Sequence, residues 1–381
     1  MYKHRELTNQ LLKHIKHFSV IGLTGPRQSG KSTLLQHVFS DYKYITFDDP
    51  TQVELFETDP KGFINNYGDN VIFDEVHHVP EIFRYIKLAV DSDRQNFGKY
   101  ILTSSNQFSF IKHASESLAG RIALLSLLPL QYSEMPDALK TESIFRGAYP
   151  ELVGRAYQLS DSWYSSYLDT YLNKDIRLLG EIGNLRDFRR LINLLAANTS
   201  QTLNMSNYAN DLGVAVNTIK RWVSLLEASY IIYLLPPYYN NLGKRITKSP
   251  KIYFYDTGLV SYLTGIKTKE LFEQGPMAGS IFENYIITEI KKKLLHDNKD
   301  AELFYFRSSD QLEIDLIVDW KIKQDFIEIK NTETFRTKFT SSMEKLMPET
   351  AQGYLLYRGT DITWKSTIQV LNYTNYLITM S

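Results

Sequence analysis

Residues 25–33, with the sequence GPRQSGKST, form a glycine-containing stretch of the kind that holds phosphate groups. The stretch fits the spacing G-x-x-x-x-G-K-[ST], with Gly25, Gly30, Lys31 and Ser32 at the fixed positions. Backbone N–H groups at the start of a helix can surround phosphate oxygens. We therefore predict an ATP site in which Lys31 reaches the outer phosphates and Ser32 binds Mg²⁺. The residues expected to contact the nucleotide are Gly25, Pro26, Arg27, Gln28, Ser29, Gly30, Lys31, Ser32, Thr33, Asp74 and Ser105.

The residues on either side of this stretch support the assignment. Residues 18–24 are apolar and partly β-branched, which is typical of a buried strand, and residues 34–39 have the apolar spacing of a helix. A chance glycine-rich turn is the alternative, but such a turn does not require a strand before it and a helix after it. The context therefore favours a phosphate-binding loop.

A second acidic element follows at residues 69–75, where an apolar run ends in two acids. Ligands of parallel sheets lie beyond the carboxyl ends of the strands, so Asp74 should lie near Ser32 and hold Mg²⁺. Glu75 would then polarise the attacking water as a general base. The alternative is a strand end with two solvated acids. Since a protein that only binds the nucleotide has no need of the second acid, the pair favours hydrolysis.

Two further strands, at residues 44–48 and 99–105, should complete the core of a parallel sheet. The second of them ends in hydroxyl side chains and is followed by an amide. Ser104, Ser105 and Asn106 are all within reach of the outermost phosphate, where one of them could orient the attacking water. The pattern does not choose among these three.

Arg121 lies between a predicted helix and a fifth apolar run, at residues 122–128. Ring-forming ATPases present an arginine from this place to the nucleotide of the neighbouring subunit, where it stabilises charge in the transition state. A surface arginine or an internal ion pair is the alternative. If Arg121 does act on the nucleotide of a neighbouring subunit, it is a catalytic residue and the protein is a homo-oligomer.

The last hundred residues contain a second possible active site. Strands expected at residues 311–318 and 325–330 alternate polar and apolar side chains, so a hairpin could bring Asp315, Glu328 and Lys330 together. Two carboxylates at close range can share Mg²⁺, and a neighbouring ammonium group can orient a water, as in a phosphodiesterase. Acids and lysines also alternate on many exposed strands, which is the alternative. The functional reading adds Glu283 from the preceding helix at residues 279–295.

Residues 201–255 have the layout of a helix-turn-helix with a wing. A short helix at 206–213 ends at glycine, and Asn217 can cap a second helix at 218–227. Strand-like runs at 231–235 and 251–255 would enclose the wing. The cations of this region are Lys220, Arg221, Lys244, Arg245, Lys248 and Lys251.

This local excess of positive charge suits a phosphate backbone, and we expect Lys220, Arg221, Lys244, Arg245 and Lys248 to contact DNA. Winged helices also serve as lids and protein docks beside ATPase cores, which is the alternative. The chain as a whole carries 43 basic and 43 acidic residues, so its net charge does not by itself indicate nucleic acid.

Composition limits the class of protein. A length of 381 residues allows two or three domains. The absence of cysteine excludes thiol catalysis, disulfides and thiolate metal sites, and it fits a reducing cytosol. No apolar run approaches the length of a membrane span, and the first residues lack an apolar signal region. We therefore expect a cytoplasmic protein without a membrane segment.

Taken in order, the motifs resemble the bacterial and archaeal AAA-type ATPases with an uncharacterised C-terminal domain of the PD-(D/E)xK nuclease-like type. The resemblance covers nearly the whole chain, through GPRQSGKST, VIFDEVHHVP, ILTSS, SLAGR, RGAYPEL, LGVAVNTIKRWVSLLE, KRITKSPKIYFYDTGL, GSIFENYI, LEIDLIV and FIEIK. It implies an ATPase site of Lys31, Ser32, Asp74 and Glu75, and a nuclease-like site of Asp315, Glu328 and Lys330. Ser104 replaces the glycine that usually follows the fourth strand, so the sensor residue stays open.

The fold that the resemblance implies is α/β: a P-loop parallel sheet of order 5-1-4-3-2, a helical winged-helix middle domain and a restriction-endonuclease-like end. We expect these domains at residues 1–150, 201–266 and 275–381, with a helical linker at 151–200. The expected function is that of an ATP-hydrolysing, DNA-associated homo-oligomer whose nucleotide cycle repositions the winged helix and nuclease-like domain, with Mg²⁺-dependent DNA cleavage as a further activity. The alternatives are a nucleotide-switched regulator and an assembly ATPase with a catalytically silent C-terminal domain.

Overall fold

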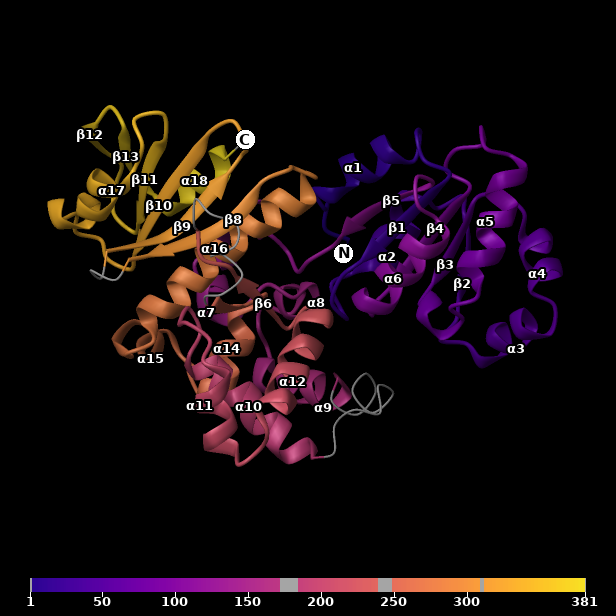
Figure 1. The fold of residues 1–381 in the computed structure, drawn as a ribbon, viewed down its shortest axis with the longest axis horizontal. Coiled ribbons are helices and arrows are strands. Elements are labelled where there is room, and N and C mark those ends of the chain that lie inside the picture. The colour runs from indigo at the N-terminus through magenta and orange to yellow at the C-terminus, as the bar shows by residue number, and fades with distance from the viewer. Residues whose placement is uncertain (1, 172–183, 239–248, 309–311, 381) are drawn as a thin grey trace. The chain divides into compact units, whose positions relative to one another are not determined.

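A computed structural model describes residues 2–171, 184–238, 249–308 and 312–380. The chain packs into two compact units (Figure 1). Unit 1 comprises residues 1–130 with the short segments 228–230 and 295–299. Unit 2 comprises residues 131–227, 231–294 and 300–381. The finer division into four parts that the sequence suggests stays a prediction.

Unit 1 is built on a five-stranded parallel sheet with the order β2-β3-β4-β1-β5. The predicted order 5-1-4-3-2 is therefore confirmed. The strands are β1 (Val20–Thr24), β2 (Lys43–Thr46), β3 (Val71–Asp74), β4 (Tyr100–Ser104) and β5 (Ile122–Ser126). The helices of this unit are α1 (Leu7–His14), α2 (Lys31–Val38), α3 (Pro50–Thr58), α4 (Pro60–Tyr67), η1 (Val76–His78), α5 (Ile82–Ser92) and α6 (Gln107–Ser117).

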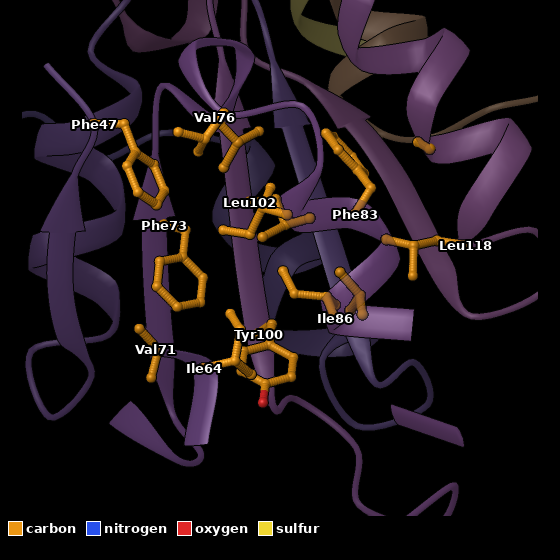
Figure 2. Close-up of a cluster of buried hydrophobic side chains, with 14 of the residues drawn as sticks. Phe47, Ile64, Val71, Phe73, Val76, Phe83, Ile86, Tyr100, Leu102 and Leu118 are labelled. Carbon is orange, nitrogen blue, oxygen red and sulfur yellow. The ribbon is translucent and has the colours of Figure 1, made fainter. Parts of the chain in front are cut away.

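The three central strands, β1, β3 and β4, are buried along their whole length. Their alternate residues point to opposite sides of the sheet, so each strand contributes to a core on both faces. Val71 and Phe73 of β3 and Leu102 of β4 join side chains of α4 and α5 in one core (Figure 2). Their neighbours Ile72 and Ile101 join leucines of α2 in a second core. The helix that follows the glycine-rich loop is thus anchored to the sheet by its own apolar face.

Unit 2 begins with a helical region. Its elements are η2 (Tyr132–Glu134), η3 (Asp137–Leu139), α7 (Ser143–Arg146), α8 (Pro150–Gly154), α9 (Ser160–Tyr171), α10 (Leu185–Ala197), α11 (Met205–Leu212), α12 (Val216–Ala228), β6 (Ile232–Leu235), β7 (Lys251–Phe254), α14 (Thr257–Thr264) and α15 (Lys269–Gln274). Helices α11 and α12 occupy the places of the predicted helix-turn-helix, and β6 pairs with β7 in an antiparallel hairpin. The winged-helix assignment itself stays a prediction.

One detail of that prediction is wrong. Asn217 does not cap the second helix. That helix, α12, begins at Val216, two residues before its predicted start, so Asn217 is already inside it. The N–H groups of Thr218 and Ile219 donate to the carbonyl oxygen of Ala215. Ala215 therefore stands before the first helical turn, and Asn217 lies within that turn.

The end of unit 2 is a six-stranded mixed sheet of order β12-β13-β11-β10-β9-β8. Strands were predicted at 311–318 and 325–330, and strands are found there with slightly different ends. The elements are α16 (Ala278–His296), β8 (Glu302–Arg307), β9 (Glu313–Asp319), β10 (Gln324–Lys330), η5 (Thr337–Thr340), α17 (Ser341–Leu346), β11 (Gln352–Tyr357), β12 (Ile362–Lys365), β13 (Ile368–Asn372) and α18 (Tyr373–Thr379). In the parts of the chain that the structure describes, no helix is both long and apolar enough to cross a membrane.

A buried polar junction in unit 2 explains why the motif RGAYPEL contains a glycine. The carboxylate of Asp256 accepts hydrogen bonds from Tyr164 Oη at 2.6 Å, from the N–H of Ala148 at 2.7 Å and from the N–H of Leu259 at 3.0 Å. Gly147 adopts a φ of +81°, and a Cβ there would lie 2.3 Å from Asp256 Oδ1. Any side chain at Gly147 would therefore displace a buried carboxylate from its donors.

Replacing Gly147 with Ala should lower the free energy of unfolding by about 3 kcal/mol or more, because left-handed strain adds to broken buried hydrogen bonds. Gly213→Ala is the matched control, since Gly213 has a φ of +67° and no atom within 4 Å of an added Cβ. The control should cost only about 1–2 kcal/mol. Urea unfolding followed by tryptophan fluorescence measures both, and equal losses would contradict the role assigned to Asp256.

Candidate nucleotide site

The glycine-rich loop of residues 25–33 joins β1 to α2, as the motif predicts. Lys31 is the first residue of α2, and Gly30 precedes it with a φ of +92°. The ammonium group of Lys31 is buried and donates to the carbonyl oxygens of Gly25 at 3.0 Å and Pro26 at 3.1 Å. Phosphate oxygens would offer this ammonium group charged acceptors, which form stronger hydrogen bonds than neutral carbonyls.

Two contacts set the shape of the loop. Gly25 has a φ of +144°, and a Cβ there would lie 2.1 Å from the carbonyl oxygen of Leu127. The buried Arg5 donates to the carbonyl oxygens of Ser29 at 2.7 Å and Leu128 at 2.5 Å. Arg5 thus ties the loop to the segment that follows β5. No motif in the sequence points to Arg5, because a single arginine near the N-terminus has no informative spacing.

The loop and the end of β3 meet at a hydroxyl and a carboxylate. Ser32 Oγ donates to Asp74 Oδ2 at 2.8 Å. Tyr44 donates to the same oxygen, and Thr103 donates to Oδ1. The hydroxyl of the loop and an acid at the end of a nearby strand, here β3, are the two protein ligands that P-loop enzymes offer to Mg²⁺.

These residues fit a nucleotide with its magnesium ion. Ser29 Oγ is buried and has no hydrogen-bond partner among the described residues. A buried hydroxyl without a partner is costly in a folded protein, so a ligand oxygen at this loop would satisfy it. Ser32 and Asp74 would hold the metal, and the main chain of the loop would hold the phosphates.

Glu75 follows Asp74 in a left-handed backbone conformation, with φ 54° and ψ 44°. Such a conformation costs a non-glycine residue on the order of 1–3 kcal/mol and is concentrated at functional sites. Its carboxylate oxygen Oε2 accepts from the N–H of Ser105 at 2.8 Å and from Ser105 Oγ at 3.2 Å, and it lies 3.2 Å from His77 Nδ1. Among the described residues, no hydrogen bond falls on the second oxygen, Oε1.

Opposing effects act on the pKa of Glu75. Burial alone would raise this pKa, but the His77 hydrogen bond, the Lys31 charge and the Ser105 N–H lower it well below its ordinary value. The carboxylate is therefore ionised at neutral pH, with one oxygen held by donors and the other available to a water.

The three candidates for the polar sensor have different surroundings. Ser105 contacts Glu75 directly, as described above, whereas Ser104 Oγ lies 3.3 Å from His77 Nδ1. Asn106 accepts from the N–H of Ser109 at 3.1 Å and caps α6. Asn106 is thus engaged in capping the start of the helix, whereas Ser105 contacts the carboxylate of Glu75 directly. The sensor role stays a prediction.

His77 is a site residue that the sequence analysis did not single out. Its imidazole touches both Glu75 and Ser104, and its ring centroid lies 4.1 Å from that of His78. The signal that was present is its position two residues beyond the strand-end acid in VIFDEVHHVP, where the short helix η1 turns it back toward the sheet.

Arg121 lies at the edge of the sheet opposite the glycine-rich loop. It precedes β5, and its carbonyl oxygen accepts from the N–H of Val20, the first residue of β1. Its guanidinium group pairs with Asp91 Oδ1 through Nε at 2.8 Å and Nη2 at 2.7 Å. With Arg94 it lines a cavity of about 260 Å³. The internal ion pair that was the alternative is present, and the role toward a neighbouring subunit stays a prediction.

The predicted DNA-contacting residues divide into three groups. Lys220 and Arg221 are exposed on α12, whose opposite face is buried. Lys244, Arg245 and Lys248 lie outside the described residues. Lys251, counted among the cations of this region, is not on the surface: it is buried and pairs with Glu283 and Glu313. It is therefore withdrawn from the basic surface that the sequence suggests.

The hairpin of β9 and β10 brings together the three residues of the predicted nuclease-like site. Lys330 Nζ lies 2.8 Å from Glu328 Oε2 and 3.2 Å from Asp315 Oδ2. The N–H of Ile329 donates to the same oxygen of Asp315 at 2.8 Å. Glu283 faces Lys251 at 3.1 Å and accepts from Tyr253 Oη at 2.6 Å.

Burial raises the pKa of Glu283 to about 7, with Lys251 opposing the shift and Asp315 adding to it. Burial and the charge of Asp315 likewise raise the pKa of Glu328. In the described parts of the chain, no group of three or more His, Cys, Asp or Glu side chains is arranged to hold a metal ion. The metal-binding role of Asp315 and Glu328 stays a prediction.

Comparisons with known proteins assign most of unit 1 to a domain family. Residues 17–136 match a family model described as an AAA domain. Residues 138–270 and 278–376 match two further models, each described as a domain of unknown function.

Relatives are found over most of the chain. The uncharacterized protein Rv2008c of Mycobacterium tuberculosis is 30% identical over 336 residues, which are 88% of this chain and 75% of the relative. The uncharacterized protein Mb2031c of Mycobacterium bovis gives the same values. An uncharacterized protein of Haemophilus influenzae is 22% identical over 310 residues, 71% of this chain and 74% of the relative.

Among solved structures, the Walker-type ATPase PABY2304 of Pyrococcus abyssi has a TM-score of 0.48 and 14% identity, over 69% of this chain and 96% of that one. The sequence relatives decide the family. The chain belongs to the family of the mycobacterial proteins Rv2008c and Mb2031c, and its residues 17–136 form an AAA-type P-loop domain.

Proposed function

We propose that this protein binds and hydrolyses ATP at the glycine-rich loop of unit 1, and that the nucleotide cycle repositions the helix-turn-helix region and the C-terminal domain on DNA. The observation that carries the ATPase proposal is the contact of Ser32 with Asp74 at 2.8 Å, next to a Glu75 carboxylate whose Oε1 accepts no hydrogen bond among the described residues. The family match of residues 17–136 to an AAA domain supports it.

Each residue of the site has a separate task. The N–H groups of the loop bind the phosphates, and Lys31 exchanges the carbonyl oxygens of Gly25 and Pro26 for phosphate oxygens. Ser32 and Asp74 hold Mg²⁺, which supplies positive charge against the phosphates when bound. Ser105 and His77 fix one oxygen of Glu75.

That arrangement determines what Glu75 can do to a water. Its second oxygen, Oε1, can accept a hydrogen bond from the attacking water and orient it. Because its pKa is held low, Glu75 orients and polarises the water more than it takes up a proton in a stable form. Phosphoryl transfer depends chiefly on such positioning and on charge stabilisation.

Support for the remaining parts of the proposal is narrower. Exposed Lys220 and Arg221 lie side by side in sequence on α12, which favours contact with a phosphate backbone. Arg121 lies at the opposite edge of the sheet from its own loop, which favours action on the nucleotide of another copy. A cytosolic location, expected from the absence of cysteine, is part of the same proposal. Mg²⁺-dependent DNA cleavage is not part of it, because Lys251 pairs with Glu283 and Glu313 and no set of three acids or histidines among the described residues is arranged to hold a metal ion.

Glu75→Gln should leave ATP affinity nearly unchanged and lower phosphate release by about 100-fold or more, because an amide cannot polarise the water as a carboxylate does. Glu81→Gln is the matched control, since Glu81 lies a few residues on and is exposed. Calorimetry measures binding, and a coupled phosphate assay measures turnover. Unchanged phosphate release from the Glu75 variant would refute the role.

Changing Lys220 and Arg221 together to Ala should weaken DNA binding and lower the slope of log K against log salt by about one unit for each lost phosphate contact. Fluorescence anisotropy with single-stranded, duplex and four-way DNA measures the effect. Lys61→Ala, an exposed lysine of unit 1, is the control. If the parent protein binds none of these DNAs, or binds them without salt dependence, the DNA part of the proposal fails while the ATPase part stands.

A further inference from the structure

The carboxylates predicted to hold a metal in unit 2 are neutralised from within the protein. We define the acidic cluster as Glu283 of α16, Glu313 and Asp315 of β9, and Glu328 of β10. Two ammonium groups enter it. Lys330 lies on β10, on the same sheet, and contacts Asp315 and Glu328. The second ammonium group comes from outside that sheet.

Lys251 supplies the second ammonium group from β7, a strand of the helical region. Its backbone pairs with Leu235 of β6, while its side chain, only 4% exposed, reaches the acidic cluster. Its Nζ lies 3.1 Å from Glu283 Oε1 and 2.6 Å from Glu313 Oε1. Tyr253, two residues along the same strand, points to the same side and donates to Glu283 Oε1 at 2.6 Å. Two neighbouring side chains of β7 are thus built into the cluster.

Ammonium groups hold one oxygen of each acid in the cluster. Lys251 takes Oε1 of both Glu283 and Glu313, while Lys330 and a backbone N–H take Oδ2 of Asp315. Within the described residues, no set of three acids or histidines converges on one point. A divalent cation needs several oxygens around one position, so it would have to displace an ammonium group first. The residues as arranged do not fit Mg²⁺.

We propose that Lys251 occupies the place of a divalent cation, so that the acidic cluster is an ion-pair joint that fastens β7 to the C-terminal sheet and excludes metal. Removal of a single ammonium group then has two consequences. It leaves Glu283 and Glu313, whose side chains are 17% and 34% exposed, without the ammonium group that pairs with both of them, which is unfavourable. It also frees carboxylate oxygens around one position, where a divalent cation can take over the neutralising role. This proposal does not depend on ATP hydrolysis.

Metal uptake by the full-length protein without nucleotide tests the proposal, with Mn²⁺ as the probe and electron paramagnetic resonance as the measure of free ion. The wild type and Asp315→Asn should take up the same amount of Mn²⁺. Lys251→Met should bind Mn²⁺ at one additional site, because the carboxylates there have lost their counter-charge. The affinity at the acidic cluster should be at least about tenfold higher than in the wild type. Adding Glu313→Gln to the Lys251→Met variant should remove the gain, because Glu313 is one of the two acids that Lys251 contacts. Any metal bound at the glycine-rich loop is unaffected by Glu313 and Asp315 and cancels in these comparisons.

Thermal unfolding supplies the second measurement. Lys251→Met should lower Tm by about 5 °C or more, and the double variant with Glu283→Gln should recover part of the loss. Mn²⁺ should raise the Tm of Lys251→Met and leave that of the wild type unchanged. If the changes in Tm caused by Lys251→Met and Glu283→Gln simply add in the double variant, the proposed ion-pair joint is refuted. Mn²⁺ uptake by the wild type that Asp315→Asn removes would overturn the exclusion of metal, and this comparison stays decisive even if Lys251→Met does not fold.

Discussion

A single carboxylate, Asp74, collects hydrogen bonds from hydroxyl groups of three elements that are far apart in the chain. Ser32 of α2, Tyr44 of β2 and Thr103 of β4 all donate to it. A buried carboxylate is tolerated only when donors satisfy it, so these contacts draw the loop helix and two strands to the end of β3. The geometry of the nucleotide site therefore follows from how the sheet satisfies one acid.

The two units neutralise their buried acids in different ways, and the difference matters for chemistry. Asp74 accepts from three neutral hydroxyl groups and the N–H of Glu75, and no ion pair to it is found among the described residues. The acidic cluster of unit 2 is instead paired with the ammonium groups of Lys251 and Lys330. A carboxylate without a counter-charge attracts a cation strongly. A carboxylate that is already paired with an ammonium group attracts a further cation less. The same residue types thus have different surroundings in the two units, which fits the proposed ligand site in one and the proposed ion-pair joint in the other.

Much of this could be predicted from the sequence, because the informative residues are local. The loop of residues 25–33 and the acids at Asp74 and Glu75 carry their chemistry within a few positions. The period-two pattern of residues 313–330 indicates a hairpin whose acids share a face, and the structure has that hairpin. The sheet order of unit 1 was implied by the family resemblance, and the structure has that order. In each case the backbone period or the motif itself sets which side chains are neighbours.

Only the tertiary structure decided which side chains of distant segments pair with each other. Arg5 reaches the loop from the N-terminus, His77 turns back onto Glu75, and Lys251 leaves the expected basic surface for Glu283 and Glu313. A lysine in a basic region has the same local pattern whether it faces solvent or a buried acid. Burial and charge compensation depend on which strands pack together, and that choice is made by the whole fold.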